Sequence, residues 1–548
     1  MAPVEIHASP SIIAVGTTSS YPTSNTTLRS IIPTLTAGSH ILLSASLTAL
    51  IIRTIFRSYL ALPPSSATRH RQHLRRGHVK LFSGLALLSL VTAGWFSLKG
   101  ASISYRTWAL ERGVDLPESI FGTRGALRGG QHPGRLEIVR WLNDTPFYRD
   151  TLEIVAEKAR YFWWGQQASL AMTSFGTYLA IEGRRRNISN LWAYLLLAQL
   201  VNLSFAQNLW FITVLLTPVP LPENVDVLTE SRIPGGLHKS HVDRDRYWFE
   251  KIVPQRADTW LPKSGFYITA LLATYSTVFL IPFASNTPSF VNIALWSKAL
   301  PFAPMLLPYI IPESWGNNYE HPHEAHASYM KVFRTISTIS SLLHLKTSGL
   351  ALLYNTPKDH YYRHHLLHPI EKVHRSSTDR AVTAIERVLG AVGDHPAVGA
   401  VGYDVVISGL SLGIWAAIRG LDGKQILRFT IPWMEKGKQA AKEVKAEVEN
   451  MVNSTDISTP LRRRGRPKKS ETPQSSSTGS RRSKSKKLQA DSDDTATYTP
   501  PSNVNEFNEG DEDEDEDWEM AALTWGVISS VGLGTGSAGV YGAEMTAR

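Results

Sequence analysis

The stretch that decides the fold is LWAYLLLAQLVNLSFAQNLWFITVLLT, residues Leu191–Thr217. It is long and apolar enough to cross a bilayer as one helix, because roughly 20 residues rising about 1.5 Å each span about 30 Å of hydrocarbon. Amide side chains are costly in lipid unless they contact protein, water or a ligand. We therefore expect a helix buried among other membrane helices, with these polar groups facing the interior: Gln199, Asn202, Ser204, Gln207 and Asn208.

Seven further apolar blocks of similar length alternate with polar connections, near residues 35–56, 81–103, 159–181, 265–283, 290–311, 332–354 and 398–418. The prolines at 301, 304 and 308 predict kinks or a break in the block 290–311. A Gly-rich block at 520–542 can form a ninth span that packs closely, because its side chains are small. The predicted fold is an all-α, polytopic transmembrane helical bundle, with its main membrane domain at residues 31–430.

The two ends of this domain differ from it in composition. Residues 1–30 are rich in Ser, Thr and Pro, and residues 435–517 contain a basic run followed by an acidic run, so both segments are predicted to be disordered. The basic run RRRGRPKK resembles an AT-hook, which binds the DNA minor groove. Since it lies beside membrane spans, we interpret it as a solvated tail and expect no nucleic-acid partner.

The sequence also indicates where the protein resides. The chain has no cysteine, which excludes disulfides, thiolate metal sites and cysteine nucleophiles. No basic segment leads into a cleavable apolar core near the N-terminus, so the first span is expected to direct insertion into the endoplasmic reticulum or another endomembrane. Basic loops after the first, third and seventh spans predict one cytosolic side, with the N-terminus and the C-terminal tail in the lumen.

Acidic residues in or beside apolar blocks are the first candidates for chemistry. Asp404 lies inside the block 398–418, Glu544 follows the last block, and Glu157 and Glu182 bracket the third. A carboxyl group in a dry pocket resists ionisation and can donate a proton near neutral pH. The alternative is that these acids pair with arginine or cap helices near the interface.

Histidines and aromatic residues give two further signals. HPHEAH at 321–326 and HYYRHHLLH at 360–368 resemble the histidine boxes of membrane oxygenases, but the predicted spans place them on opposite sides, so we expect no metal. Tryptophans such as Trp164 can anchor a helix at the interface or stabilise a cation through the ring. The spans lack an Asp-Asp-x-x-Asp motif, which disfavours Mg²⁺-dependent diphosphate chemistry.

Four stretches together resemble fungal integral-membrane terpene cyclases of meroterpenoid pathways, of the ascochlorin and ascofuranone type. They are residues Trp141–Gln167, Leu203–Glu223, Gly402–Asp422 and Ser537–Glu544. The resemblance implies protonation of a terminal epoxide or alkene on a prenylated aromatic substrate, followed by ring closure without a metal or cofactor. It also implies a lipophilic small molecule and membrane lipids as partners, with other pathway enzymes as possible neighbours.

The sequence therefore predicts a membrane-bound isomerase or cyclase of secondary metabolism. Asp404 is the first choice as proton donor, and Glu544 or Glu157 are the alternatives. The residues expected to bind substrate are Gln167, Asn202, Gln207, Asn208 and Trp164. Two other functions stay open: a non-enzymatic membrane scaffold or transport component, and a histidine-box di-iron oxygenase.

Overall fold

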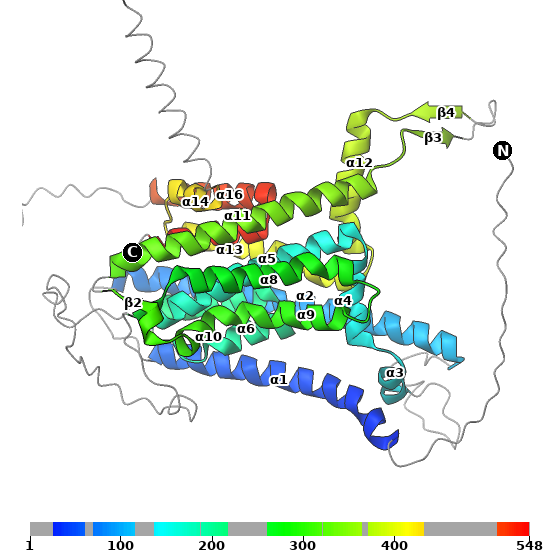
Figure 1. Cartoon of the computed structure of the whole chain (residues 1–548), viewed down its shortest axis with the longest axis horizontal. Coiled ribbons are helices and arrows are strands. Elements are labelled where there is room, and N and C mark those ends of the chain that lie inside the picture. The colour runs from blue at the N-terminus through cyan, green and yellow to red at the C-terminus, as the bar shows by residue number, and fades with distance from the viewer. Residues whose placement is uncertain are drawn as a thin grey trace, which may run out of the picture. The chain divides into compact units, whose positions relative to one another are not determined.

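The computed structural model describes residues 26–60, 69–114, 136–186, 188–217, 260–319, 322–363, 371–431 and 512–546 (Figure 1). The chain divides into two units, of which the second, residues 433–516, lies almost entirely outside the described part. The disorder predicted for most of 1–30 and of 435–517 therefore falls outside it too. Both predicted disordered segments extend too far toward the membrane domain, because α1 begins at Thr26 and α16 begins at Glu512.

Long helices make up most of the described chain, which confirms the all-α prediction. Those that run the length of the bundle are α1 (Thr26–Leu60), α2 (Arg69–Arg112), α5 (Ala159–Arg185), α8 (Ser264–Ala284), α11 (Pro322–Asn355) and α13 (Pro396–Ile418). Five stretches among the described residues are long and apolar enough to cross a membrane: Ile32–Leu60, Arg75–Arg112, Ser264–Ala284, Phe290–Ile310 and Pro396–Ile418. Each of the five coincides with a predicted span.

Short elements connect these helices at the ends of the bundle. They are α3 (Ile138–Asp144), α4 (Phe147–Glu157), α12 (Ser377–Leu389), α14 (Gly423–Thr430) and the 3-10 turns at Glu313–Trp315 and Gly390–Gly393. Two antiparallel strand pairs accompany them: β1 (Trp260–Pro262) with β2 (Gly316–Asn318), and β3 (His360–Arg363) with β4 (Glu371–His374).

The proline-rich block breaks where its sequence predicts. It forms α9 (Phe290–Ala299), a 3-10 turn at Leu300–Phe302 and α10 (Ala303–Ile310). Pro301 has no amide hydrogen for a helical bond, so the α-helical bonding gives way to a 3-10 turn at this point, although Leu300 keeps helical dihedrals. The predicted interruption at the prolines is present as a 3-10 turn within the stretch Phe290–Ile310.

The stretch 191–217 is not one continuous span, so that prediction was wrong. It forms α6 (Leu191–Leu200) and α7 (Leu203–Leu216), which run antiparallel. The Tyr194 hydroxyl lies 2.8 Å from the Thr213 hydroxyl, and the Tyr194 ring packs edge-on against Trp210. We call this pair the α6–α7 hairpin, and its tip is Val201 and Asn202.

Both outer ends of the α6–α7 hairpin lie at the same end of the bundle. Leu191, where α6 begins, packs against Gly183 near the end of α5. Arg186, just after α5, donates to the carbonyl oxygens of Val214 and Thr217 at the end of α7. The hairpin therefore enters and leaves the bundle at one end, with its tip inside.

The hairpin changes the direction predicted for every later helix. Because the hairpin does not cross the bundle, α8 starts beside the end of α5. There Arg184 Nη2 donates to the Trp260 carbonyl oxygen over 3.4 Å. At the opposite end, Arg160 near the start of α5 contacts Asn355, the last residue of α11. The loops after the third and seventh predicted spans thus lie at opposite ends, and the prediction that they share one side was wrong.

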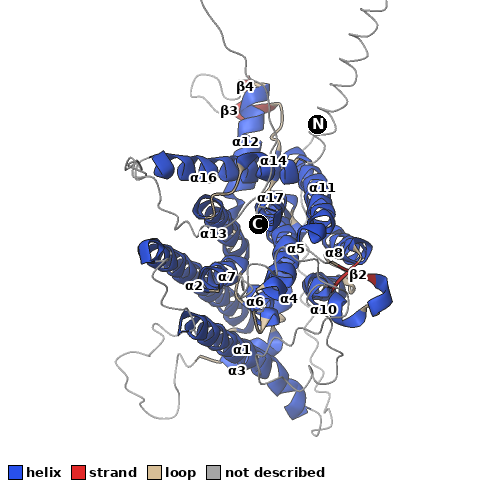
Figure 2. Cartoon of the chain, turned by 90° about the vertical axis from the view of Figure 1, so that its left-hand side faces the viewer, coloured by secondary structure: helices blue, strands red, loops and turns tan. Residues whose placement is uncertain are grey.

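The C-terminal apolar block is also broken. It forms α16 (Glu512–Val531) and α17 (Leu533–Thr546), separated by Gly532, whose φ is +88°. Figure 2 shows α16 lying across the helices that point toward the viewer. From Leu533 to Met545 every residue of α17 is buried. Its small residues permit this, since a Cβ added at Gly534 would lie 2.4 Å from the Leu170 Cβ.

Replacing Gly532 with alanine should destabilise the protein. A Cβ there would lie 2.7 Å from Gln167 Oε1 and from His344 Nδ1, and a positive φ costs an L-residue about 1–2 kcal/mol. The apparent melting temperature of the full-length protein in detergent should fall. Gly526→Ala is the control, because nothing lies within 4 Å of its added Cβ and alanine favours helix. Equal melting temperatures for the two variants would contradict the assignment of Gly532 as a required turn.

Candidate functional site

The tip of the α6–α7 hairpin is held by polar groups from neighbouring helices. Asp404 on α13 accepts hydrogen bonds from the backbone N–H groups of Leu203 and Ser204, at 3.0 and 2.7 Å. Asn202 accepts from the Phe205 N–H at 3.1 Å and donates to the Ser89 carbonyl oxygen on α2 at 3.0 Å. The first three N–H groups of α7, which no helical carbonyl can reach, are thereby paired.

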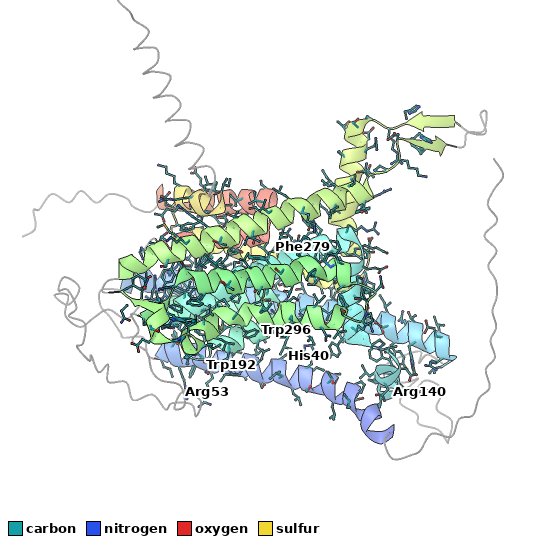
Figure 3. All side chains as sticks on the ribbon, viewed as in Figure 1. His40, Arg53, Arg140, Trp192, Phe279 and Trp296 are labelled. Carbon is teal, nitrogen blue, oxygen red and sulfur yellow. The ribbon has the colours of Figure 1, made fainter. Side chains whose placement is uncertain are left out.

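At the end of α6 the polar groups are basic side chains, in contrast to the carboxylate at the start of α7. The His40 ring Nε2 lies 2.9 Å from the Leu200 carbonyl oxygen, and Lys298 donates to the side chain of Gln199 over 3.4 Å. His40 comes from α1, where Figure 3 labels it. A helix carries partial positive charge at its start and negative charge at its end, so Asp404 and Lys298 each match the helix end they approach.

Asp404 therefore acts in this structure as a helix cap. Its side chain is buried, as predicted, but both carboxylate oxygens accept backbone hydrogen bonds. This is the capping alternative raised from the sequence, and it leaves the role of first-choice proton donor without structural support.

Three of the four amide side chains predicted to face the interior do so, and the fourth, Gln199, is half-buried. Asn202, Gln207 and Asn208 are all buried, and Gln207 exchanges hydrogen bonds with Ser408 on α13. Asn208 Oδ1, one helical turn past Ser204 on α7, is buried with no hydrogen-bond partner among the described residues. Buried polar atoms of this kind are where a bound molecule or water is expected.

Gln167 and Trp164 belong to a different part of the interior. Gln167 accepts from the Leu533 N–H at 2.8 Å, which caps α17, and its amide nitrogen contacts His344 Nδ1 on α11. Trp164 donates to the Val388 carbonyl oxygen of α12 at 3.1 Å. The structure therefore does not bring these two predicted substrate residues together with Asn208.

Glu544 is the predicted acid with the densest set of partners. Its carboxylate accepts from the Tyr178 hydroxyl at 2.7 Å, from Trp415 Nε1 at 2.8 Å and from Arg419 Nε and Nη2 at 2.9 Å each. Its exposed fraction is 1%. We call Glu544, Tyr178, Trp415 and Arg419 the Glu544 centre.

Aromatic rings surround the Glu544 centre. The Tyr178 and Tyr541 rings stack with centroids 4.2 Å apart, and Trp415 stacks on Phe211 at 4.3 Å. Trp210 meets Tyr178 edge-on, and its indole N–H is buried with no partner among the described residues. Sequence reasoning missed Tyr178 and Arg419. The signal available was a tyrosine inside one apolar block and an arginine just past the end of another.

The predicted acids do not form one cluster. Asp404 and Trp415 lie eleven positions apart on the same helix, which corresponds to about 16 Å along the axis. Glu157 is exposed at the end of α4, so its proposed role as a buried proton donor was wrong. Its helix is amphipathic and lies between α3 and α5, and its last acid faces outward.

Histidines gather at no shared site in the described part of the chain. No group of three metal-ligating side chains occurs there. His326 and His360 lie at opposite ends of α11, as the sequence predicts, because that helix has 34 residues. The side chains of His321, His323, His364, His365 and His368 fall outside the description. No observation here favours the histidine-box oxygenase.

Comparison with known proteins identifies no family, because no family model, curated protein or solved structure matches the chain. The class of protein is defined by the fold alone: an all-α bundle with several helices long and apolar enough to span a membrane, a hairpin that enters from one end, and three buried acids, Glu182, Asp404 and Glu544.

Removing the Asp404 carboxylate should destabilise the hairpin tip. Asp404→Ala leaves two buried N–H groups unpaired, at a cost of roughly 1–3 kcal/mol each. Asp404→Asn keeps one acceptor oxygen, so it should lower the stability of the protein less than Asp404→Ala does. The melting temperature of the full-length protein in detergent measures the difference. The control is Val406→Ala on the exposed side of the same helix. A melting temperature for Asp404→Ala equal to the control would contradict the capping role.

Proposed function

We propose that the chain is a polytopic membrane protein of the endoplasmic reticulum or another endomembrane, with the bundle axis along the membrane normal. Large apolar side chains on the outside support this: Leu42, Leu98 and Ile310 are 72, 72 and 71% exposed. Trp192, Phe279 and Trp296, labelled in Figure 3, are exposed too. Such a surface is unfavourable in water and favourable in lipid.

Within that setting we propose a metal-free cyclisation or isomerisation of a prenylated, lipophilic substrate. The observation that carries the proposal is the meeting of the four cyclase-like stretches in the interior. Phe211 of the second stretch stacks on Trp415 of the third, and Trp415 donates to Glu544 of the fourth. Gln167 of the first caps the helix that carries Glu544.

The Glu544 centre replaces Asp404 as the proposed acid. A protonated Glu544 donates its proton to the alkene carbon or epoxide oxygen, an internal double bond closes the ring, and the cation returns a proton to the carboxylate. The reaction is an isomerisation, so no other reactant is needed. The rings of Trp415, Tyr541 and Phe211 surround this centre, and the Trp415 ring that Arg419 covers can stabilise the cation once Arg419 has moved outward. Ser204 and Asn208 on α7 orient the polar head of the substrate.

This role requires that the Glu544 carboxylate take up a proton and that the Arg419 guanidinium move away from that carboxylate. Arg419 sits at the end of α13, and its side chain is 16% exposed, so it has room to move outward. Tyr178 keeps Glu544 oriented while Arg419 is displaced, because its hydroxyl bonds to the other carboxylate oxygen.

Glu544→Gln should abolish turnover. We expect at least a roughly 100-fold loss, the usual cost of removing a general acid. The assay is product analysis in yeast microsomes that contain the full-length protein, supplied with prenylated phenols and their epoxides. Glu157→Gln is the matched control, because it alters an exposed acid.

Folding has to be separated from chemistry in this test. Tyr178→Phe retains the ring stack with Tyr541 and removes only the hydroxyl, so it should reduce turnover while the protein remains folded. Expression level and melting temperature are measured for each variant. Normal product formation by Glu544→Gln would overturn the assignment of Glu544.

A membrane transport component is the second candidate. The α6–α7 hairpin favours it, because helices that end inside the membrane commonly form binding sites of transporters. The same microsomes separate the two functions. A prenylated compound that binds or crosses the membrane unchanged supports transport, and a rearranged compound of equal mass supports the cyclase.

A further inference from the structure

Three consecutive arginines lie at the end of α5: Arg184 and Arg185 in its last turn and Arg186 directly after it. We call them the arginine cluster. Among the described residues, one carboxylate forms ion pairs with the cluster: Glu182 pairs with Arg185 at 3.1 Å and with Arg186. The cluster therefore has two more positive charges than the acid it contacts. Excess charge at a partly buried site is costly unless an anion compensates it.

Two guanidinium nitrogens of the cluster are buried without an acceptor. The Arg186 side chain is 2% exposed; its Nε pairs with Glu182 and its Nη1 donates to the end of α7. Its Nη2 has no partner in the described part of the chain, and neither has Nη1 of Arg184. A buried charged donor normally has an acceptor, because leaving it unpaired costs the full desolvation of that group.

The surroundings of the cluster have the composition of a membrane–water boundary. Arg184 donates to the carbonyl oxygen of Trp260 in β1. Trp315, just before β2, stacks on Phe266 with centroids 5.6 Å apart and is 53% exposed. Rings of this kind gather at the level of lipid headgroups. The buried donors of the cluster therefore lie at the end of the bundle where headgroup phosphates are available.

We propose that the arginine cluster binds a phosphate group, supplied by the headgroup of an anionic membrane phospholipid. The planar guanidinium matches two phosphate oxygens at once, and one or two negative charges bring the cluster close to neutrality. Anionic phospholipids supply such phosphate groups at the headgroup level of a membrane. The proposal rests on membrane insertion and is independent of the cyclase chemistry.

The test measures the melting temperature of the delipidated, full-length protein in neutral detergent. The probes are dioctanoyl phosphatidic acid, dioctanoyl phosphatidylcholine and inorganic phosphate, each at the same concentration. Phosphatidic acid should raise the melting temperature by several degrees, because a ligand that binds only the folded state stabilises it. Phosphatidylcholine and inorganic phosphate should have little effect.

The variants assign the effect to the cluster. Arg184→Gln should remove most of the shift produced by phosphatidic acid, since it removes a buried unpaired donor without uncapping α7. Arg149→Gln is the matched control, because it removes one positive charge from an exposed pair on α4. Retained lipid counted by native mass spectrometry should fall for Arg184→Gln alone, even where that variant melts lower.

The outcomes separate the sources of the phosphate. If inorganic phosphate alone raises the melting temperature as much as phosphatidic acid does, the cluster is a phosphate site but a lipid is not the source of the phosphate. The proposal would be overturned by equal melting-temperature shifts with phosphatidic acid and phosphatidylcholine, or by no shift with any probe. It would also be overturned if Arg184→Gln and Arg149→Gln reduced the shift equally.

Discussion

The structure depends on pairing the backbone groups of a chain that reverses direction inside an apolar bundle. At the tip of the α6–α7 hairpin, N–H groups of α7 and carbonyl groups of α6 point into the interior of the bundle, and each group left unpaired there would cost roughly 1–3 kcal/mol. Asp404, Asn202 and His40 supply the partners from three different elements. The positions of α1, α2 and α13 around the tip follow from this requirement.

The same requirement recurs at α17 and explains how Glu544 comes to be buried. Gly532 turns the chain inward, Gln167 caps the new helix, and the helix is then enclosed along its whole length. Small side chains let α17 approach its neighbours closely. The α6–α7 hairpin and α17 are therefore two inserted elements, each started by a polar side chain from a surrounding helix.

Apolar blocks and the proline break could be predicted from the sequence, because hydropathy and backbone chemistry are local. The reversal at Asn202 could not, since a 27-residue apolar run reads the same whether it crosses or folds back. One local signal was present: asparagine is a strong helix start, and Asn202 stands in the middle of the run. The pairing of Glu544 with Tyr178 joins residues 366 positions apart, which no local pattern encodes.

Asp404 and Glu544, two of the three buried acids, differ in what their helices gain from them. Asp404 faces the positive start of α7, where a carboxylate stabilises the helix. Glu544 lies in the last turns of α17, where a negative charge opposes the helix dipole and where burial adds to the cost. Arg419 offsets that cost, although an apolar residue in place of Glu544 would avoid it altogether. Residues that contradict the local rules of stability are expected at functional sites. The position of Glu544 is thus the stronger argument for chemistry, and the position of Asp404 is explained by folding alone.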